Sequence, residues 1–179
     1  MTTDSDLWLF GYGSLIWRPD FVWVEACPGV IRGWARRFWQ ASVDHRGVPH
    51  YPGRVVTLVP DPGAECPGMG YRINADRREE ILVALDYRER GGYARHKVSL
   101  ALDDGRTVEA LVYLANSENP CYAGAAPAAS IASRIARARG ASGTNRDYFL
   151  KLVAFLQARG VIEPHVEAIH QALSEWPAT

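Results

Sequence analysis

Two glycines that follow an apolar run are the first feature of this sequence that could do chemistry. They lie in FGYGSL, residues 10–15, where Gly11 and Gly13 let the backbone turn sharply and approach a ligand closely. Successive N–H groups in such a turn can form a nest that binds an anion or an oxyanion. The sequence lacks the third glycine of a dinucleotide-binding fingerprint and the Gly-Lys-Ser/Thr of a phosphate-binding loop. The alternative is a tight turn that only ends a strand.

The second candidate is the carboxylate of Glu89 within DYRERGGY, residues 86–93. A carboxylate at a helix C-terminus lies in an unfavourable dipole field, which raises its affinity for a proton. The neighbouring Arg88 and Arg90 act in the opposite direction if they face it. The two glycines that follow allow Tyr93 to fold back toward the acid. Such a glutamate is suited to acid–base chemistry, and the alternative is a solvated glutamate at a helix end.

The other reactive side chains are poorly arranged for catalysis. Ser14 is not in a GxSxG elbow, and His165 and His170 are five residues apart, which does not place them on one helix face as a metal pair. The sequence has three cysteines, Cys27, Cys66 and Cys121, and they form no CxxC pair. We therefore expect free structural thiols in a reducing compartment. We therefore expect no metal site.

The composition indicates which class of protein this is. The chain has 179 residues, of which 47% are apolar and 22% charged, and its formal net charge is zero. These values predict a soluble globule with one domain over residues 1–179 and no overall attraction to nucleic acid or to an anionic membrane. The polar N-terminus and the short, glycine-interrupted run at 7–17 predict neither a signal peptide nor a membrane span, and hence a cytoplasmic protein.

The elements that must position these residues are mostly strands first and helices last. Hydrophobic patterning predicts strands at 7–12, 30–42, 55–59, 69–73, 97–102 and 107–114, with turns at 60–63 (PDPG) and 103–106 (DDGR). Helical spacing and capping residues predict helices at 76–90, 127–139, 144–159 and from 164 onward. The predicted fold class is α+β, a small mixed β-barrel or sheet with peripheral and C-terminal helices.

Taken together, several sequence blocks resemble the ChaC family of γ-glutamylcyclotransferases, whose members act on glutathione. The resemblance extends from about residue 9 to about residue 171, with the blocks in the family's order: FGYGSLIW (10–17), RRFWQ (36–40), DHRGVP (44–49), PGRVVTLV (52–59), YRERGGY (87–93), NP (119–120), SGTN (142–145) and PHV (164–166). The family often has Lys where Arg90 stands, a mild departure. The family's catalytic acid falls on Glu89.

The resemblance implies a cofactor-free reaction on a small molecule, with Glu89 as the catalytic residue. The γ-glutamyl α-amine attacks its own side-chain carbonyl and yields 5-oxoproline and the freed amine, which is Cys-Gly for glutathione. The family's substrate-binding loop maps onto Leu9, Phe10, Gly11, Tyr12, Gly13 and Ser14, with Leu15 beside it. Tyr93 and Tyr148 are either substrate contacts or packing residues. The implied γ-glutamylcyclotransferase-like fold is a mixed β-barrel with peripheral helices.

The residue types suit this reaction independently. An α-ammonium group cannot attack, so a base must remove a proton, and a glutamate in a partly desolvated pocket can be tuned for that. Ring closure is intramolecular, so holding the near-attack geometry can replace covalent catalysis. Two rival hypotheses stay open on the sequence: an enzyme that acts on γ-glutamylamines, and a non-catalytic binding module on the same fold.

Overall fold

The computed structural model describes residues 6–177, which form two compact units. The barrel unit comprises the residues up to Arg36 together with Leu58–Asn116, and the helical unit comprises Arg37–Thr57 and the residues from Ser117 onward. The chain passes between the units inside two long strands, β2 (Glu25–Ser42) and β3 (Gly53–Ile73). That residues 1–179 form a single domain stays a prediction.

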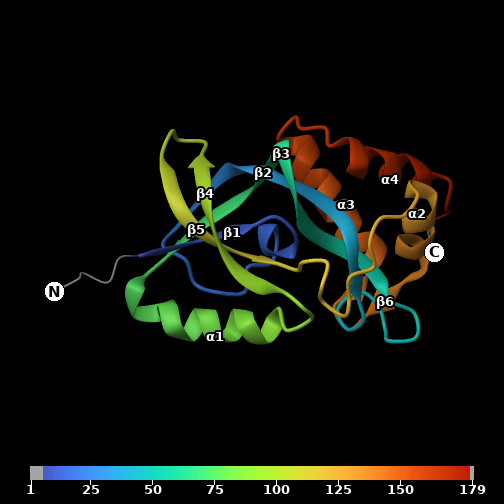
Figure 1. Cartoon of the computed structure of the whole chain (residues 1–179), viewed down its shortest axis with the longest axis horizontal. Helices are drawn as coiled ribbons and strands as arrows, with labels where there is room; N and C mark the ends of the chain where they lie inside the picture. The colour runs from blue at the N-terminus through green and yellow to red at the C-terminus, as the bar shows by residue number, and fades with distance from the viewer. Residues whose placement is uncertain (1–5, 178–179) are drawn as a thin grey trace. The chain divides into compact units, whose positions relative to one another are not determined.

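The barrel unit is built around a closed barrel with the strand order β1-β3-β2-β4-β5 (Figure 1). β1 (Leu7–Gly11) lies antiparallel to β3 and parallel to β5 (Thr107–Leu114), with Leu9 opposite Tyr71 and Leu111. β4 (Ala94–Leu102) and β5 form the predicted hairpin. All residues of β1 after the first are buried, as an apolar run between two strands requires.

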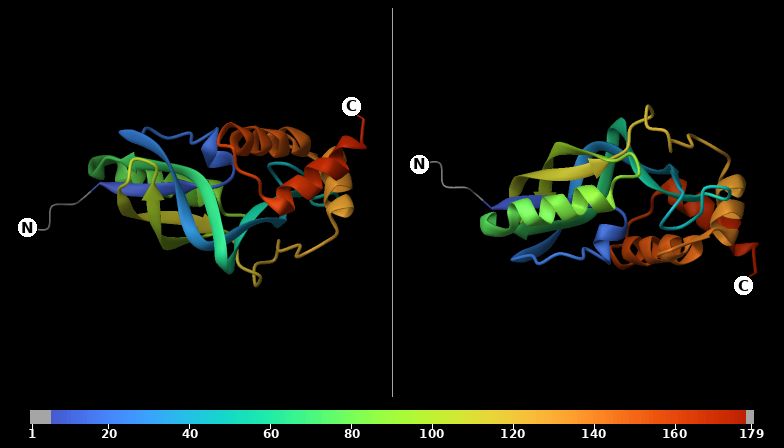
Figure 2. Two further views of the ribbon diagram at one scale, coloured as in Figure 1. Left: turned by 90° about the horizontal axis from the view of Figure 1, so that it is seen from above. Right: turned by 90° about the horizontal axis from the view of Figure 1, so that it is seen from below.

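The helix α1 (Arg78–Arg88) runs along the barrel strands, as Figures 1 and 2 show. It follows a short 3-10 turn, Ala75–Arg77, whose N-cap Asn74 accepts a hydrogen bond from the N–H of Asp76. Its apolar side packs into a buried cluster with residues of the strands and of the glycine loop: Leu9, Leu15, Tyr71, Ile73, Ile81, Leu82, Leu85 and Tyr113. This packing fixes the end of α1, where Glu89 lies.

The helical unit contains α2 (Ala128–Arg137), α3 (Asn145–Ala158) and α4 (Pro164–Ser174), with α2 packed against both of the others (Figure 2). A small two-stranded sheet, β6 (Arg139–Gly140) and β7 (Gly143–Thr144), precedes α3. Thr144 caps α3 by accepting a 3.1 Å hydrogen bond from the N–H of Asp147. The predicted cap of α3, the predicted place of Pro164 in the first turn of α4, and the α+β class are confirmed.

The predicted turn at 60–63 is wrong. β3 runs without interruption from Gly53 to Ile73 and joins the two strands predicted at 55–59 and 69–73. Pro60, Pro62 and Gly63 lie on an exposed stretch of this strand, where a missing N–H and a missing side chain are tolerated. Pairing of β3 with its neighbours keeps the segment extended, so tertiary contacts override the local turn signal.

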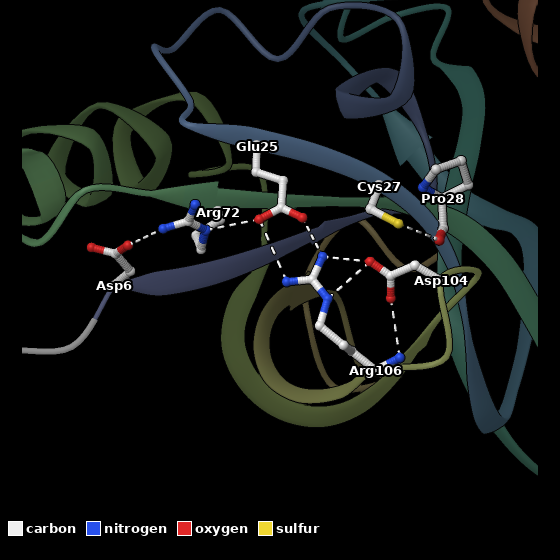
Figure 3. Close-up of polar contacts among 7 residues, drawn as sticks. All are labelled: Asp6, Glu25, Cys27, Pro28, Arg72, Asp104 and Arg106. Carbon is white, nitrogen blue, oxygen red and sulfur yellow. Dashed lines mark hydrogen bonds and ion pairs between the residues drawn. The ribbon is translucent and has the colours of Figure 1, made fainter.

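A chain of ion pairs joins the strands on the barrel surface (Figure 3). Arg72 pairs with Asp6 and Glu25, and Arg106 pairs with Glu25 and with Asp104, whose Oδ2 lies 2.8 Å from Arg106 Nε. The two guanidinium groups, Arg106 first, hold the pKa of Glu25 below its usual value. Because these groups are exposed or only partly buried, we assign the network to the surface of the fold rather than to a site.

None of the helices in residues 6–177 is both long and apolar enough to cross a membrane.

Candidate functional site

The glycine loop leaves β1 and closes back on itself at once. A Cβ added to Gly11 would lie 2.8 Å from the Cβ of Leu15, so the loop admits no side chain there. The 3-10 turn Ser14–Ile16 follows, and the N–H of Ile16 donates to the carbonyl of Gly13 over 2.9 Å. Gly13 has φ −131°, outside the left-handed region. The amides of Ser14 and Leu15 are at the start of this turn, and N–H groups at the start of a helix have no partner within the helix.

Two side chains from the barrel hold this loop by its carbonyl groups. The Arg36 guanidinium, 2% exposed, donates to the carbonyl of Tyr12 over 2.8 Å. The Tyr71 hydroxyl donates to the carbonyls of Leu15 and Ile16 over 2.8 and 3.1 Å. Burial raises the pKa of Tyr71 to about 12, so its hydroxyl stays a donor. With its carbonyls held in this way, the loop keeps one conformation and its amides can be preorganised for an anion.

A glycine of β3 allows the loop to lie this close to the barrel wall. A Cβ on Gly68 would lie 2.3 Å from the carbonyl oxygen of Gly11 and 2.6 Å from the ring of Phe10. Distances under 3 Å to backbone cannot be accommodated without movement, so a side chain at position 68 would displace the start of the loop.

Glu89 is the C-cap of α1, and its side chain is only 17% exposed. Its N–H donates to the carbonyl of Leu85 over 2.8 Å, and its carbonyl accepts from the N–H of Tyr93 over 3.2 Å. Glu89 is therefore not a solvated glutamate at a helix end. Partial burial and the helix C-terminus both favour the protonated carboxyl, and the guanidinium of Arg88, 3.5 Å from Glu89 Oε1, favours the carboxylate.

The structure brings the glycine loop and Glu89 together through Arg88. Arg88 Nη2 donates to Ser14 Oγ over 2.9 Å, while its Nε faces Glu89. One guanidinium thus touches both motifs that the sequence analysis selected separately. A carboxylate able to exchange a proton and a turn of backbone amides lie in one region of the barrel unit.

A neighbouring acid, Asp86, is fully engaged elsewhere. Arg95 Nε donates to its Oδ1 over 2.8 Å, Arg95 also pairs with its Oδ2, and the Tyr113 hydroxyl donates to Oδ1 over 2.7 Å. Arg95 first and then Tyr113 hold the pKa of Asp86 below its usual value. Asp86 therefore anchors α1 to β4 and β5 and is a poor acceptor for a further proton.

The loop residues contribute to a site by different means. Leu9 and Phe10 are each 1% exposed, so their side chains belong to the core and only position the loop. The Tyr12 side chain is also buried, and its hydroxyl donates to the carbonyl of Tyr113 over 2.7 Å. The Ser14 side chain is half-buried, and contact of this loop with a ligand stays a prediction.

The two tyrosines named from the sequence have different surroundings. Tyr93 lies four residues after Glu89 and is partly buried against the cluster that contains residues of α1. Tyr148 lies in the helical unit, where its ring packs edge-on against Phe38 and its hydroxyl accepts from the N–H of Val56 over 3.3 Å. Packing accounts for Tyr148, and contact of either tyrosine with substrate stays a prediction.

Three residues around the loop were not assigned from the sequence: Arg36, Tyr71 and Arg88. Arg36 and Arg88 belong to the RRFWQ and YRERGGY blocks that resemble the family. Membership of these blocks is the sequence signal that could have identified them as site residues. The sequence has 20 Lys and Arg residues, and nothing local separates a guanidinium that holds a loop from one that is solvated. Within residues 6–177, no three His, Cys, Asp or Glu side chains gather as metal ligands would.

Comparison with known proteins adds family evidence to this geometry. The sequence model of the family described as ChaC-like protein matches residues 7–175. A glutathione-specific γ-glutamylcyclotransferase 1 of Rattus norvegicus is 42% identical, over 93% of this chain and 78% of the relative. A glutathione-specific γ-glutamylcyclotransferase of Saccharomyces cerevisiae is 32% identical, over 92% of this chain and 94% of the relative. A crystal structure of the yeast cyclotransferase specific to glutathione superposes with a TM-score of 0.89 at 28% identity, covering 96% of this chain and 97% of that one.

Proposed function

The chain belongs to the ChaC-like family, and on that premise we propose that it is a glutathione-specific γ-glutamylcyclotransferase with Glu89 as its general acid–base. The enzyme converts glutathione to 5-oxoproline and Cys-Gly. The observation that carries the role of Glu89 is its position: a carboxylate 17% exposed at the end of α1, joined to the glycine loop through one guanidinium.

Glu89 acts twice in the proposed cycle. Its carboxylate first removes a proton from the α-ammonium group of the γ-glutamyl residue, and the freed amine nitrogen attacks the γ-carbonyl carbon. The ring nitrogen of the tetrahedral intermediate then loses its second proton to solvent. The intermediate collapses, the C–N bond to the cysteinyl nitrogen breaks, and the protonated Glu89 gives its proton to that nitrogen, which leaves as the amine of Cys-Gly. Because ring closure is intramolecular, holding the amine against the carbonyl supplies much of the rate acceleration.

The glycine loop binds the substrate in this proposal. The backbone amides at residues 12–15 stabilise either the oxyanion of the intermediate or the α-carboxylate of the γ-glutamyl group. The hydrogen bonds from Arg36 and Tyr71 to the loop carbonyls support this role. They fix the loop backbone, so its N–H groups need little reorganisation during the reaction. Tyr93 is proposed as a further substrate contact.

We propose that the reaction takes place in the cytoplasm and requires only the small-molecule substrate, with no cofactor, metal, nucleic acid or membrane. Every step above is acid–base chemistry and acyl transfer, which a carboxylate and backbone donors can perform. The cysteines Cys27, Cys66 and Cys121 are free thiols, which supports a reducing compartment.

The test is incubation of the purified protein with glutathione and detection of 5-oxoproline. N-acetylated glutathione should be inert, because its α-nitrogen can no longer act as the nucleophile. Equal turnover of the acetylated compound would rule out cyclisation. Faster release of 5-oxoproline from γ-glutamyl-ε-lysine than from glutathione would favour a γ-glutamylamine cyclotransferase. Binding of glutathione without product would favour a non-catalytic module.

A further inference from the structure

The guanidinium of Arg88 contacts both the glycine loop and the chain that follows it. Its side chain is 19% exposed. Nη2 donates to Ser14 Oγ over 2.9 Å, and Nη1 donates to the carbonyls of Arg18 and Pro19 over 2.7 and 3.3 Å. The planar donor fork of arginine suits several acceptors at fixed angles, which a single ammonium group does not.

The same guanidinium reaches the proposed base through its third nitrogen. Arg88 Nε lies 3.5 Å from Glu89 Oε1, and both side chains are partly buried. A movement of Arg88 would therefore displace the loop and change the charge beside the Glu89 carboxylate at the same time. Arg36 and Tyr71 also hold the loop, but the hydrogen bonds described between them and the loop reach its carbonyls.

We propose that Arg88 is a positioning residue for the cyclisation, which sets the glycine loop against Glu89 and keeps the Glu89 carboxylate ionised for proton removal. This inference rests on the proposed function. It assigns Arg88 two separable effects: hydrogen bonds from Nη1 and Nη2 order the loop that binds substrate, and the positive charge at Nε favours the basic form of Glu89.

The other charged groups near the pair are already engaged. Asp20 Oδ2 lies 3.5 Å from Arg88 Nη1 and accepts from Arg18 Nε over 2.7 Å. Asp86, one turn before Glu89, pairs with Arg95. Arg88 is a cation in direct contact with Glu89.

Arg90 offers a matched control. It flanks Glu89 on the other side in the sequence, is exposed, and places its guanidinium carbon 4.3 Å from the ring centroid of the exposed Tyr87. Its described contacts do not reach the loop. Removing Arg90 deletes the same charge next to Glu89 in sequence without deleting a contact with the site.

The experiment compares Arg88→Ala, Arg88→Lys, Ser14→Ala and Arg90→Ala by kcat, KM and the pH dependence of kcat/KM with glutathione, with the melting temperature of each variant recorded. Arg88→Ala should lower kcat/KM about tenfold or more, the usual scale for hydrogen bonds from a charged group, and Arg90→Ala should stay within about twofold of the parent. Arg88→Ala should also move the acidic limb of the profile to higher pH by about half a unit or more, because the carboxylate loses its neighbouring cation and is protonated more readily.

The other two variants separate the effects. Arg88→Lys keeps the charge but not the fork, so it should raise KM while leaving the acidic limb in place. Ser14→Ala should raise KM less, also with an unmoved limb. If Arg88→Ala does not fold, Arg88→Lys and Ser14→Ala decide the proposal. The proposal would be overturned if both of these variants had the same KM as the parent.

Two results would overturn the assignment while the proposed function stands: an active parent with Arg88→Ala as active as Arg90→Ala, or a folded Arg88→Ala with reduced activity and an unmoved acidic limb. A parent protein that makes no 5-oxoproline would instead overturn the proposed function, and the role of Arg88 with it.

Discussion

Replacing Glu89 by Gln tests the mechanism with little disturbance of the structure. The amide has nearly the volume of the carboxyl group but cannot accept a proton at neutral pH. The backbone hydrogen bonds of residue 89, to the carbonyl of Leu85 and from the N–H of Tyr93, do not depend on its side chain. The change therefore removes proton transfer while leaving the end of α1 in place.

The expected magnitudes for activity and stability are very different. A positioned general base contributes about 10²–10⁴-fold to the rate, so kcat should fall by that factor, which corresponds to about 2.7–5.5 kcal/mol in the activation barrier. The described contact with Arg88 joins two partly buried groups over 3.5 Å, so its loss should cost about 1 kcal/mol or less of folding free energy. Binding of glutathione should change little or tighten, because one negative charge near the substrate carboxylates disappears.

The assay is release of 5-oxoproline under saturating glutathione, with thermal unfolding as the measure of folding. Glu79→Gln is the matched control, since Glu79 is an exposed glutamate in the first turn of the same helix and should behave as the parent. Glu89→Asp keeps the charge but retracts it by one methylene, so an intermediate or severe loss would show that position matters as well as basicity. If folded Glu89→Gln stays within about threefold of the parent, Glu89 is not the base, and the role passes to another group.

Three further predictions concern the surrounding structure. Burial first, and then Arg37, lower the pKa of His165 to about 4, and its neutral ring accepts from the N–H of Phe38 over 3.0 Å. Since the folded pKa lies below the unfolded value, this contribution to stability is complete above about pH 6.5 and is lost as the pH falls toward 4, so the melting temperature of His165→Gln should fall less over that range than that of the parent; equal slopes would contradict this. Gly68→Ala should raise KM by displacing the carbonyl of Gly11, and kinetics identical to the parent would show that the loop tolerates the shift. Simultaneous replacement of Cys27, Cys66 and Cys121 by Ala, or addition of a chelator, should leave most specific activity of the folded protein. Complete loss of activity would point to a thiol nucleophile or a bound ion.

Local signals in the sequence determined most of the elements and both motifs of the site. The apolar run at 7–12 predicted a strand buried on both sides, and β1 is one. The polar turn at 103–106 predicted the hairpin of β4 and β5, and Thr144 predicted the start of α3. These features depend on neighbours within a few residues, so patterning and capping are enough to read them.

Tertiary structure decided the features that depend on distant contacts. The PDPG segment at 60–63 carries a turn signal, yet pairing within the barrel keeps it in β3. The sequence left open whether Glu89 is solvated or enclosed, and the packing of α1 on the barrel leaves it 17% exposed. Among the many arginines, Arg88 stands out only because the fold brings Ser14 and the carbonyls of Arg18 and Pro19 within hydrogen-bond distance of its guanidinium. A guanidinium has the same chemistry wherever it stands in the sequence, and which acceptors it meets is set by residues far away along the chain.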